Sequence, residues 1–237
     1  TGCRTSRPFL GKVRQSFLGS RYQPAEMGAN EVLALLEPYL HPSPVFVVIS
    51  GPSGVGKDAV IQRMRERGAP FHFLVTATDR PARPGEVHGK DYYFYSTKEF
   101  ERMIAEGEFL EYASVYGQYK GVPKSQARRA LASGVDVVMR IDVQGAATIR
   151  HLVPEMISIF LAPPSLEILA SRLARRGADS PEQVEARLRT ALEELRHLHE
   201  FDYVVINREN DLDGTVDQIT AIIEAEKCRI GRAQVIL

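Results

Sequence analysis

Short apolar runs alternate with segments of helical periodicity along most of the chain. Apolar runs of strand length predict buried strands at 46–49, 135–142, 156–161 and 203–206. Apolar residues that recur every three or four positions predict helices at 98–106, 124–133, 144–152, 165–176, 181–199 and from 212 onward. Strands that alternate with helices are typical of a mainly parallel sheet with helices on both faces. The pattern therefore predicts an α/β fold.

The middle of the chain is more polar and interrupts this alternation. Residues 71–76 and 109–115 predict further strands, and 91–95 a short one. Residues 78–90 are rich in proline, glycine and charge, so we expect them to be irregular and exposed. We interpret 76–122 as an insertion over the carboxyl edge of the sheet, where ligands bind in such folds.

The first residues are basic and contain no acidic side chain up to residue 25. This bias is typical of part of an organelle transit segment, and a disordered basic arm or a remnant of protein expression is an equal alternative. Residues 26–40 predict a short helix, and Pro42-Ser43-Pro44 a linker. We therefore divide the chain into an extension at 1–44, a domain at 45–230 and a tail at 231–237.

Composition narrows the class of protein. The 237 residues suffice for one α/β domain with insertions, and the 30 basic and 30 acidic side chains cancel, which argues against nucleic acid as a partner. Cys3 and Cys228 lie at opposite ends of the chain without metal-ligand spacing, which fits a reducing compartment. No apolar run approaches membrane-spanning length.

A glycine-bracketed loop follows the first buried run and closes on a lysine, in the sequence GPSGVGK at 51–57. Ala59, Val60, Ile61 and Met64 then fall at helical spacing. A strand, such a loop and a helix form the context of a phosphate-binding loop. Its backbone N–H groups make an anion cup at the positive end of the helix, and Lys57 reaches the β- and γ-phosphates. The alternative is a tight turn with a chance lysine.

The residue after this lysine departs from the usual pattern. Serine or threonine normally stands there and holds Mg²⁺ through its hydroxyl, whereas this chain has Asp58. A carboxylate also suits Mg²⁺ and a helix N-terminus. Our hypothesis is that Asp58 ligates Mg²⁺ directly or through water.

Two arginines in the polar middle suit a doubly charged phosphate. Arg80 and Arg83 lie three residues apart, and each guanidinium can bind a phosphate bidentately. Tyr92 offers a neutral hydroxyl donor nearby in the sequence. The alternative is a solvated charged loop, and only the phosphate loop elsewhere in the chain favours the phosphate interpretation.

From about residue 46 to about residue 223 the chain resembles the guanylate kinase family. Besides the loop, the resemblance rests on RPARPGEVHGKDYYF at 80–94, EFLEYA at 108–113, IDVQG at 141–145, LAPPS at 161–165 and RLARRG at 172–177. It implies the P-loop nucleoside monophosphate kinase fold, with a GMP-binding insertion at 76–122 and a short helical lid at about 172–188. It implies Mg²⁺-dependent transfer of the γ-phosphoryl group of ATP to GMP, and we expect dGMP to be accepted too.

The resemblance also implies roles, position by position. Lys57 matches the loop lysine, and Arg176 and Arg187 match arginines of the lid and its following helix that reach the transferring phosphoryl group. Asn207 matches a residue near adenine. The resulting ATP-binding set is Gly51, Pro52, Ser53, Gly54, Val55, Gly56, Lys57, Asp58 and Asn207. The GMP-binding set is Thr76, Arg80, Arg83, Glu86, Tyr92, Glu111, Lys120 and Asp142.

Two of these carboxylates fit the chemistry of guanine. Its N1–H and its exocyclic amine are donors, and Glu111 and Asp142 can accept from them. Adenine has an acceptor at N1, which a carboxylate would repel. A site built around a substrate hydrogen-bond group can reject an analogue without it by ~10⁴-fold. Taken alone, Glu111 would be a surface carboxylate.

Three further positions depart from the family pattern. Lys120 stands where a phosphate-binding tyrosine is usual, and Val122 stands where a hydroxyl residue is usual. We expect Lys120 to hold phosphate by charge and Tyr119 to compensate through a shift of the loop. Arg140 replaces an acidic residue and shares a strand face with Asp142, so the two could pair.

Three other functions remain as alternatives. They are a guanylate-kinase-like protein-binding module, another small-molecule kinase of the same fold, and a P-loop GTPase, for which no NKxD-type motif is present. We expect ATP and GMP as partners, no membrane and no obligate protein partner, and a monomer or weak dimer. The basic N-terminus favours a plastid or mitochondrion over the cytoplasm.

Overall fold

The computed structural model describes residues 28–115, 117–175 and 181–237. Contacts divide the chain into two units, one ending at Leu40 and the other spanning His41–Leu237. The described part of the first unit forms two short helices, α1 (Ala29–Ala34) and α2 (Glu37–Leu40), in place of the single predicted helix. No helix in the described ranges is long and apolar enough to cross a membrane.

The second unit contains a central parallel sheet. Its strands are β1 (Phe46–Ser50), β2 (His72–Phe73), β7 (Val137–Arg140), β8 (Ile157–Ala162) and β9 (Tyr203–Ile206), in the order β2-β7-β1-β8-β9. Within this sheet Ile49 of β1 lies opposite Arg140 of β7 and Ile159 of β8. All carboxyl ends therefore meet at one edge, as the strand–helix alternation predicts.

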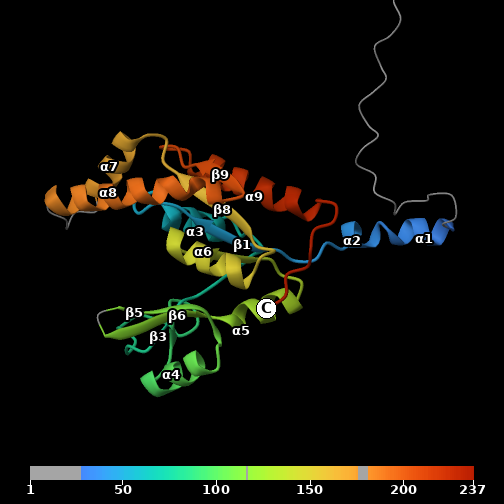
Figure 1. Cartoon of the computed structure of the whole chain (residues 1–237), viewed down its shortest axis with the longest axis horizontal. Coiled ribbons are helices and arrows are strands. Elements are labelled where there is room, and N and C mark those ends of the chain that lie inside the picture. Colours follow the sequence, from blue (N-terminus) through green and yellow to red (C-terminus); the bar gives the residue numbers. More distant parts are fainter. Residues whose placement is uncertain (1–27, 116, 176–180) are drawn as a thin grey trace, which may run out of the picture. The chain divides into compact units, whose positions relative to one another are not determined.

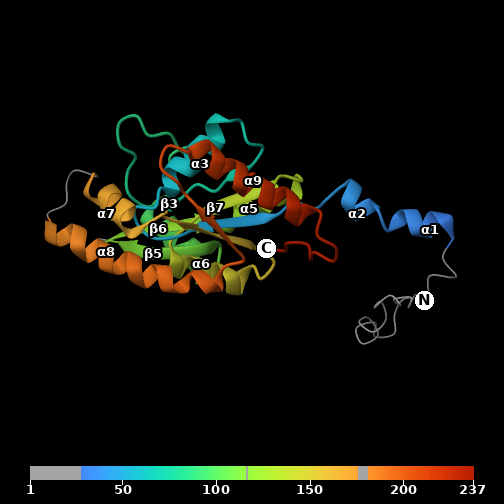
Figure 2. The same ribbon diagram turned by 90° about the horizontal axis from the view of Figure 1, so that it is seen from above.

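Helices cover both faces of this sheet, which is why β1 is buried along its whole length. On one face, Val47 and Ile49 of β1 pack with α3 (Lys57–Glu66) and α9 (Leu212–Lys227). On the other, Phe46 and Val48 pack with α5 (Lys124–Ala132) and α6 (Val143–Leu152). Figure 2 shows α3 and α9 opposite α6 and α8 (Pro181–Arg196), with strands between them. The expected two-faced α/β core is confirmed.

A second, smaller sheet lies to one side of the central one (Figure 1). Its strands are β3 (Ala77–Thr78), β4 (Tyr93–Phe94), β5 (Phe109–Val115) and β6 (Gln118–Pro123), in the order β4-β3-β6-β5. β3 and β4 are parallel, whereas β6 is antiparallel to both of its neighbours. Helix α4 (Thr97–Ala105) packs beneath it, and Phe100 stacks on Phe109 with 4.3 Å between ring centroids.

Several expected boundaries in this region were wrong. The strand expected at 71–76 shrinks to the two residues of β2, and β6 was not expected at all. The sequence of β6 includes Lys120, Gly121 and Pro123, which lack strand propensity. Antiparallel pairing with β5 forms this strand, and pairing is a tertiary contact that local composition does not report.

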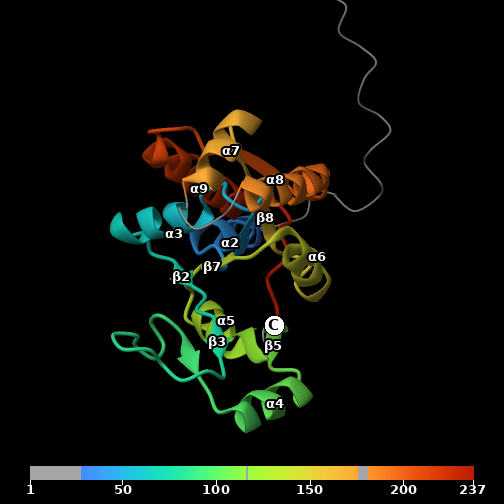
Figure 3. The same ribbon diagram turned by 90° about the vertical axis from the view of Figure 1, so that its left-hand side faces the viewer.

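Helix α7 (Leu166–Ala174) lies on the opposite side of the central sheet from α4 (Figure 3). Ser165 caps its N-terminus, and the hydroxyl of Ser165 accepts a hydrogen bond from the N–H of Ile168. The expected lid tip at Gly177, Ala178 and Asp179, and the expected helix cap at Ser180, lie outside the described residues. After α8 a single 3₁₀ turn (His197–Glu200) leads to β9. Near the C-terminus, Val235 is buried against the face of the central sheet that α5 and α6 cover.

Candidate active site

The loop after β1 has the geometry of an anion cradle. Gly51, Gly54 and Gly56 all have positive φ, and the ladder of β1 ends at Ser50. A Cβ on Gly51 would overlap the backbone carbonyl oxygen of Leu161, so only glycine fits this turn. Gly56, with φ of 102°, caps α3, which therefore starts at Lys57 with its free N–H groups facing the loop. The predicted strand–loop–helix context is confirmed.

The side chain of Lys57 folds back onto the loop. Its Nζ donates hydrogen bonds to the carbonyl oxygens of Gly51 at 2.5 Å and Pro52 at 3.1 Å. Burial lowers the pKa of Lys57, and the charge of nearby Arg140 lowers it further. The carboxylates of Glu194, Asp142 and Asp58 act in the opposite direction. Lys57 thus lies within electrostatic reach of groups from α8 and from the end of β7, besides the adjacent Asp58.

Helix α8 contributes two charged side chains to the phosphate loop. Arg187 donates from Nη2 to Oγ of Ser53 at 3.1 Å, which brings the predicted arginine to the loop. Glu194, which the sequence analysis did not single out, accepts a hydrogen bond from the backbone N–H of Ser53 at 3.0 Å. The sequence could have indicated Glu194, because it lies seven residues, or two helical turns, after Arg187 and therefore on the same face of the helix. Arg176 lies outside the described residues, so its role stays a prediction.

A cavity of about 400 Å³ opens beside this loop, and Asn207 and Arg172 are among its lining residues. Asn207 is buried, and its Nδ2 donates to the carbonyl oxygen of Val55 at 2.8 Å. Arg172 donates to that same oxygen at 3.1 Å and to the carbonyl oxygen of Asn207 at 2.9 Å. Burial lowers the pKa of Arg172. Sequence reasoning missed Arg172, which ties the phosphate loop to the segment that follows β9.

The segment 80–92 holds an arginine in a carboxylate clamp. The guanidinium of Arg80 donates to both oxygens of Glu86, at 2.7 and 2.6 Å, and Glu86 also accepts from the N–H of Arg83 at 2.7 Å. These contacts with Arg80 and Arg83 lower the pKa of Glu86 to about 2. Arg80 also lies over the ring of Tyr92, 4.9 Å from its centroid. Glu86 therefore orients Arg80. The sequence analysis had placed Glu86 among the GMP-binding residues without predicting this role.

Glu111 and Asp142 come together from different sheets. Asp142 follows β7 and caps α6 by accepting a hydrogen bond from the N–H of Gly145 at 2.7 Å. Glu111 lies on β5, and its Oε2 would be 3.2 Å from a Cβ on Gly145. Burial raises the pKa of Glu111, and the charge of Asp142 raises it further. The two predicted guanine-facing carboxylates are thus neighbours, and Gly145 lets the side chain of Ile141 pack close to them.

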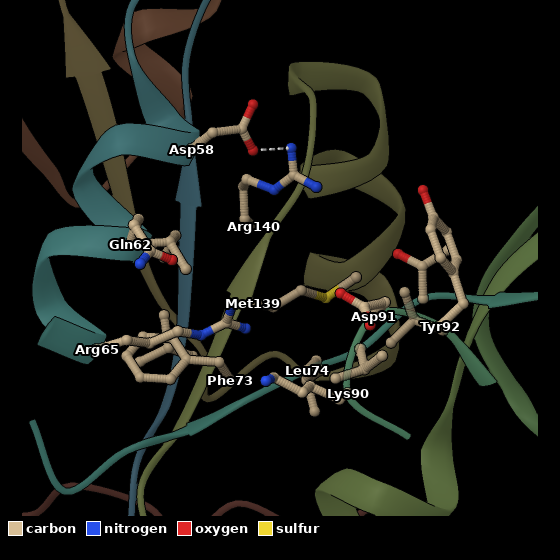
Figure 4. Close-up of a pocket in the computed structure, with 15 residues that line it drawn as sticks. Asp58, Gln62, Arg65, Phe73, Leu74, Lys90, Asp91, Tyr92, Met139 and Arg140 are labelled. Carbon is tan, nitrogen blue, oxygen red and sulfur yellow. Dashed lines mark ion pairs between the residues drawn. The ribbon is translucent and has the colours of Figure 1, made fainter. Parts of the chain in front are cut away.

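A cleft of about 350 Å³ lies between α3 and the second sheet, and Thr76, Tyr92, Asp58 and Arg140 are among the residues that line it. Figure 4 shows Asp58 and Arg140 pointing toward one another at one end, with Tyr92 and Asp91 farther along. The backbone before Thr76 is held by Gln126, which exchanges two hydrogen bonds with Val75. Residues of the expected donor and acceptor sets therefore share one cleft.

The unusual residues of β6 have different surroundings. Lys120 is exposed, whereas Val122 is buried in the core and lines the cleft. The expectation that Tyr119 replaces the missing tyrosine was wrong. Its ring stacks on Phe100, with 5.3 Å between centroids, on the α4 side of the sheet. Residues 119 and 120 point to opposite faces of a strand, which is why Tyr119 does not follow Lys120.

The expected pairing of Arg140 with Asp142 was also wrong. Arg140 pairs with Asp58 instead, with 2.5 Å between Nη1 and Oδ1. Strand β7 ends at Arg140, and Asp142 turns its carboxylate into the cap of α6. The pairing was expected because residues 140 and 142 would share a face of one strand, but Asp142 lies beyond the end of that strand.

Carboxylates suited to a metal ion are sparse in the described ranges. No group of three or more His, Cys, Asp or Glu side chains there could hold one. Mg²⁺ in phosphoryl-transfer sites is commonly held by one or two carboxylates together with substrate phosphates. Asp58 supplies one carboxylate beside the phosphate loop. This fits a Mg²⁺ site that substrate phosphates complete, and it does not fit a site in which the protein supplies all the ligands.

The fold and the phosphate loop define a P-loop phosphotransferase. Residues 43–226 match the guanylate kinase family. The chain is 52% identical over 195 residues to "Guanylate kinase 2, chloroplastic/mitochondrial" of Oryza sativa subsp. japonica, covering 82% of this chain and 68% of that protein. It is 45% identical over 188 residues to a guanylate kinase of Caldanaerobacter subterraneus subsp. tengcongensis, covering 79% and 90%.

A solved structure agrees with these sequence comparisons. The crystal structure of guanylate kinase from Anaplasma phagocytophilum has a TM-score of 0.59 and 35% identity to this chain, covering 80% of this chain and 89% of the other. The chain therefore belongs to the guanylate kinase family, and the predicted fold is confirmed.

Proposed function

We propose that the protein catalyses transfer of the γ-phosphoryl group of ATP to GMP, giving ADP and GDP, through the residues described above. Membership of the guanylate kinase family supports this activity. The observation that carries the assignment of the site is a juxtaposition. The charge of Asp142, which follows β7, acts both on Lys57 of the loop after β1 and on Glu111 of β5, so the phosphate loop and the two carboxylates lie at the same edge of the central sheet.

On the donor side, backbone N–H groups of the loop at 51–57, in which Pro52 has none, hold the phosphates, and the positive φ of Gly51, Gly54 and Gly56 favours such a cradle. Lys57 leaves the carbonyl oxygens of its own loop and contacts the β- and γ-phosphates. Asn207 and Arg172 line the space for adenine. Arg187, with Arg176 from the lid, neutralises charge on the transferring group.

On the acceptor side, Arg80, Arg83 and Tyr92 hold the phosphate of GMP. Glu86 keeps Arg80 in one orientation through two hydrogen bonds, which lowers the cost of ordering its guanidinium on binding. Thr76 and Lys120 border the nucleotide. Glu111 and Asp142 accept hydrogen bonds from guanine, and their charges oppose the N1 acceptor of adenine.

The chain's own residues have little covalent chemistry to perform. The GMP phosphate is the nucleophile and is ionised near neutral pH, so the site needs no strong general base. When bound with ATP, Mg²⁺ would neutralise charge on the phosphate oxygens, and Asp58 is the candidate protein ligand through Oδ2, since its Oδ1 contacts Arg140. Closure of the 172–188 lid excludes water and prevents hydrolysis of ATP.

One relative and the basic N-terminal residues support a cellular location for this activity. We infer a plastid or mitochondrion, because the rice relative carries that location in its name and the first residues are basic. We further propose that residues 1–44 are an extension to a catalytic domain at 45–230, and that dGMP is accepted as well as GMP. ATP and GMP are the proposed partners of a monomer or weak dimer.

The test is a coupled assay of ADP formation with ATP, Mg²⁺ and GMP, AMP, UMP or CMP in turn. We expect turnover with GMP alone. Binding of ATP and GMP without turnover would instead support a binding module, and turnover with another acceptor would support a different kinase of this fold. Absence of binding to both nucleotides would refute the proposed function.

A further inference from the structure

Two unusual residues lie in direct contact in the structure, one at the phosphate loop and one at the end of β7. Asp58 occupies the position of the usual hydroxyl residue, and Arg140 is the last residue of β7. The side chains form an ion pair at 2.5 Å, and Figure 4 shows the contact at one end of the cleft. A carboxylate on the helix and a guanidinium on the strand thus replace a hydroxyl and a carboxylate.

Structural stabilisation is a poor explanation for this pair. The side chain of Arg140 is 45% exposed and that of Asp58 is 64% exposed. Exposed ion pairs contribute about 0–1 kcal/mol to stability. The pair also links residues that β1–β7 pairing and the packing of α3 already hold together. The chain gains little fold stability from the contact.

The position of Arg140 favours a role toward phosphate. Arg140 lies opposite Ile49 of β1, so it leaves the sheet at the edge from which the phosphate loop also leaves. Its charge acts on Lys57, the residue that reaches the β- and γ-phosphates. Apart from the contact with Asp58, no hydrogen bond or ion pair of Arg140 to the described residues is present, which leaves N–H donors of the guanidinium for a ligand.

We propose that Arg140 is a further phosphate-binding residue of the donor site and that Asp58 is its positioning residue. Arg140 supplies a permanent positive charge to the terminal phosphates of ATP. Asp58 holds the guanidinium at the end of α3 instead of leaving it free in solvent. The protein therefore binds ATP with less dependence on a divalent cation than a site with the usual hydroxyl and carboxylate. This inference rests on the proposed function.

The experiment measures dissociation constants of AMP, ADP, ATP and GMP by calorimetry at fixed ionic strength, in EDTA and in Mg²⁺. Arg140→Met is expected to weaken ATP binding in EDTA about tenfold, the loss of one charge-assisted hydrogen bond, and AMP binding by less than twofold. Arg140→Lys should recover part of the loss. In Mg²⁺ the loss of ATP affinity should be smaller, because the cation already neutralises the phosphates.

The double variant Asp58→Ser/Arg140→Asp restores the usual pair of residue types. Its ratio of ATP dissociation constants without and with Mg²⁺ should rise at least tenfold above that of the unchanged protein. The positioning role is tested by measuring the effect of Arg140→Met in an Asp58→Asn background. There the effect should shrink from about tenfold to about threefold, because the guanidinium is no longer held.

Arg63→Met is the matched control. Arg63 lies on the same helix and forms an ion pair of similar exposure with Asp213 at 2.8 Å, on the side of α3 that faces α9. Its replacement removes the same charge and should change ATP affinity by less than twofold. Circular dichroism and thermal unfolding of each variant establish that it is folded.

The outcomes separate the inference from the proposed function. If the unchanged protein fails to bind ATP even with Mg²⁺, the proposed function itself fails. If it binds ATP and Arg140→Met matches Arg63→Met, or weakens GMP binding alone, the inference is overturned while the function stands. An undiminished effect of Arg140→Met in the Asp58→Asn background would refute the positioning role.

Discussion

Replacing Glu111 with glutamine should improve the stability of the empty protein and impair its recognition of GMP. Burial and the charge of Asp142 both raise the pKa of Glu111, so its ionised form is disfavoured in the fold. A carboxylate whose folded pKa is raised contributes stability below its unfolded pKa and loses that contribution as pH rises through the folded value. At pH values above the unfolded pKa, the raised pKa of Glu111 therefore destabilises the protein, and a neutral amide removes this cost.

The loss of function can be estimated from the hydrogen bonds. A glutamine keeps the shape, but it offers one acceptor oxygen without charge and adds an N–H₂ group that opposes the donors of guanine. Losing one hydrogen bond to a charged group costs about 1.5–3 kcal/mol, or roughly 10- to 150-fold in kcat/KM for GMP. Activity with AMP should rise relative to GMP, because the repulsion of adenine N1 is weakened.

The assay combines urea unfolding at pH 7 with steady-state kinetics on GMP and AMP. Glu108→Gln is the matched control, because Glu108 is three residues earlier and pairs on the surface with Arg128 at 2.7 Å. The free energy of unfolding of the control should fall by no more than the small contribution of an exposed ion pair, and the control should still prefer GMP to AMP. A Glu111→Gln protein that is less stable at pH 7, or that retains the kcat/KM for GMP, would refute the reasoning.

Three other substitutions test separate parts of the structure. Glu86→Gln should raise the KM for GMP about tenfold, because it releases Arg80. The dependence of activity on pH between about 5 and 8 should not change, because the pKa of Glu86 is about 2. Glu106→Gln is the kinetic control, since Glu106 forms an exposed ion pair with Arg102. Arg172→Met should raise the KM for ATP about tenfold without changing that for GMP, and equal rises in both would contradict a donor-side role. Phe100→Ala should lower the free energy of unfolding by about 3–5 kcal/mol in urea titrations, whereas a loss near zero would mean that the α4 cluster adds no stability.

The sequence was sufficient for features that depend on local pattern. The apolar runs located β1, β8 and β9, and helical periodicity located α4 to α9 within a few residues. The glycine spacing at 51–57 fixed the phosphate loop, because positive φ at those positions is a property of glycine itself. Motif blocks indicated the family, which the comparisons then showed.

Tertiary structure decided which of these residues meet. Strand β6 forms through pairing with β5, and the partner of Arg140 is Asp58 and not the nearby Asp142. Glu194 reaches the phosphate loop across 141 positions of the chain. Local periodicity reports which face of an element is buried but not which distant side chain lies opposite it. Parallel strand order brings such side chains to one edge of the sheet, and that order becomes visible only in the folded protein.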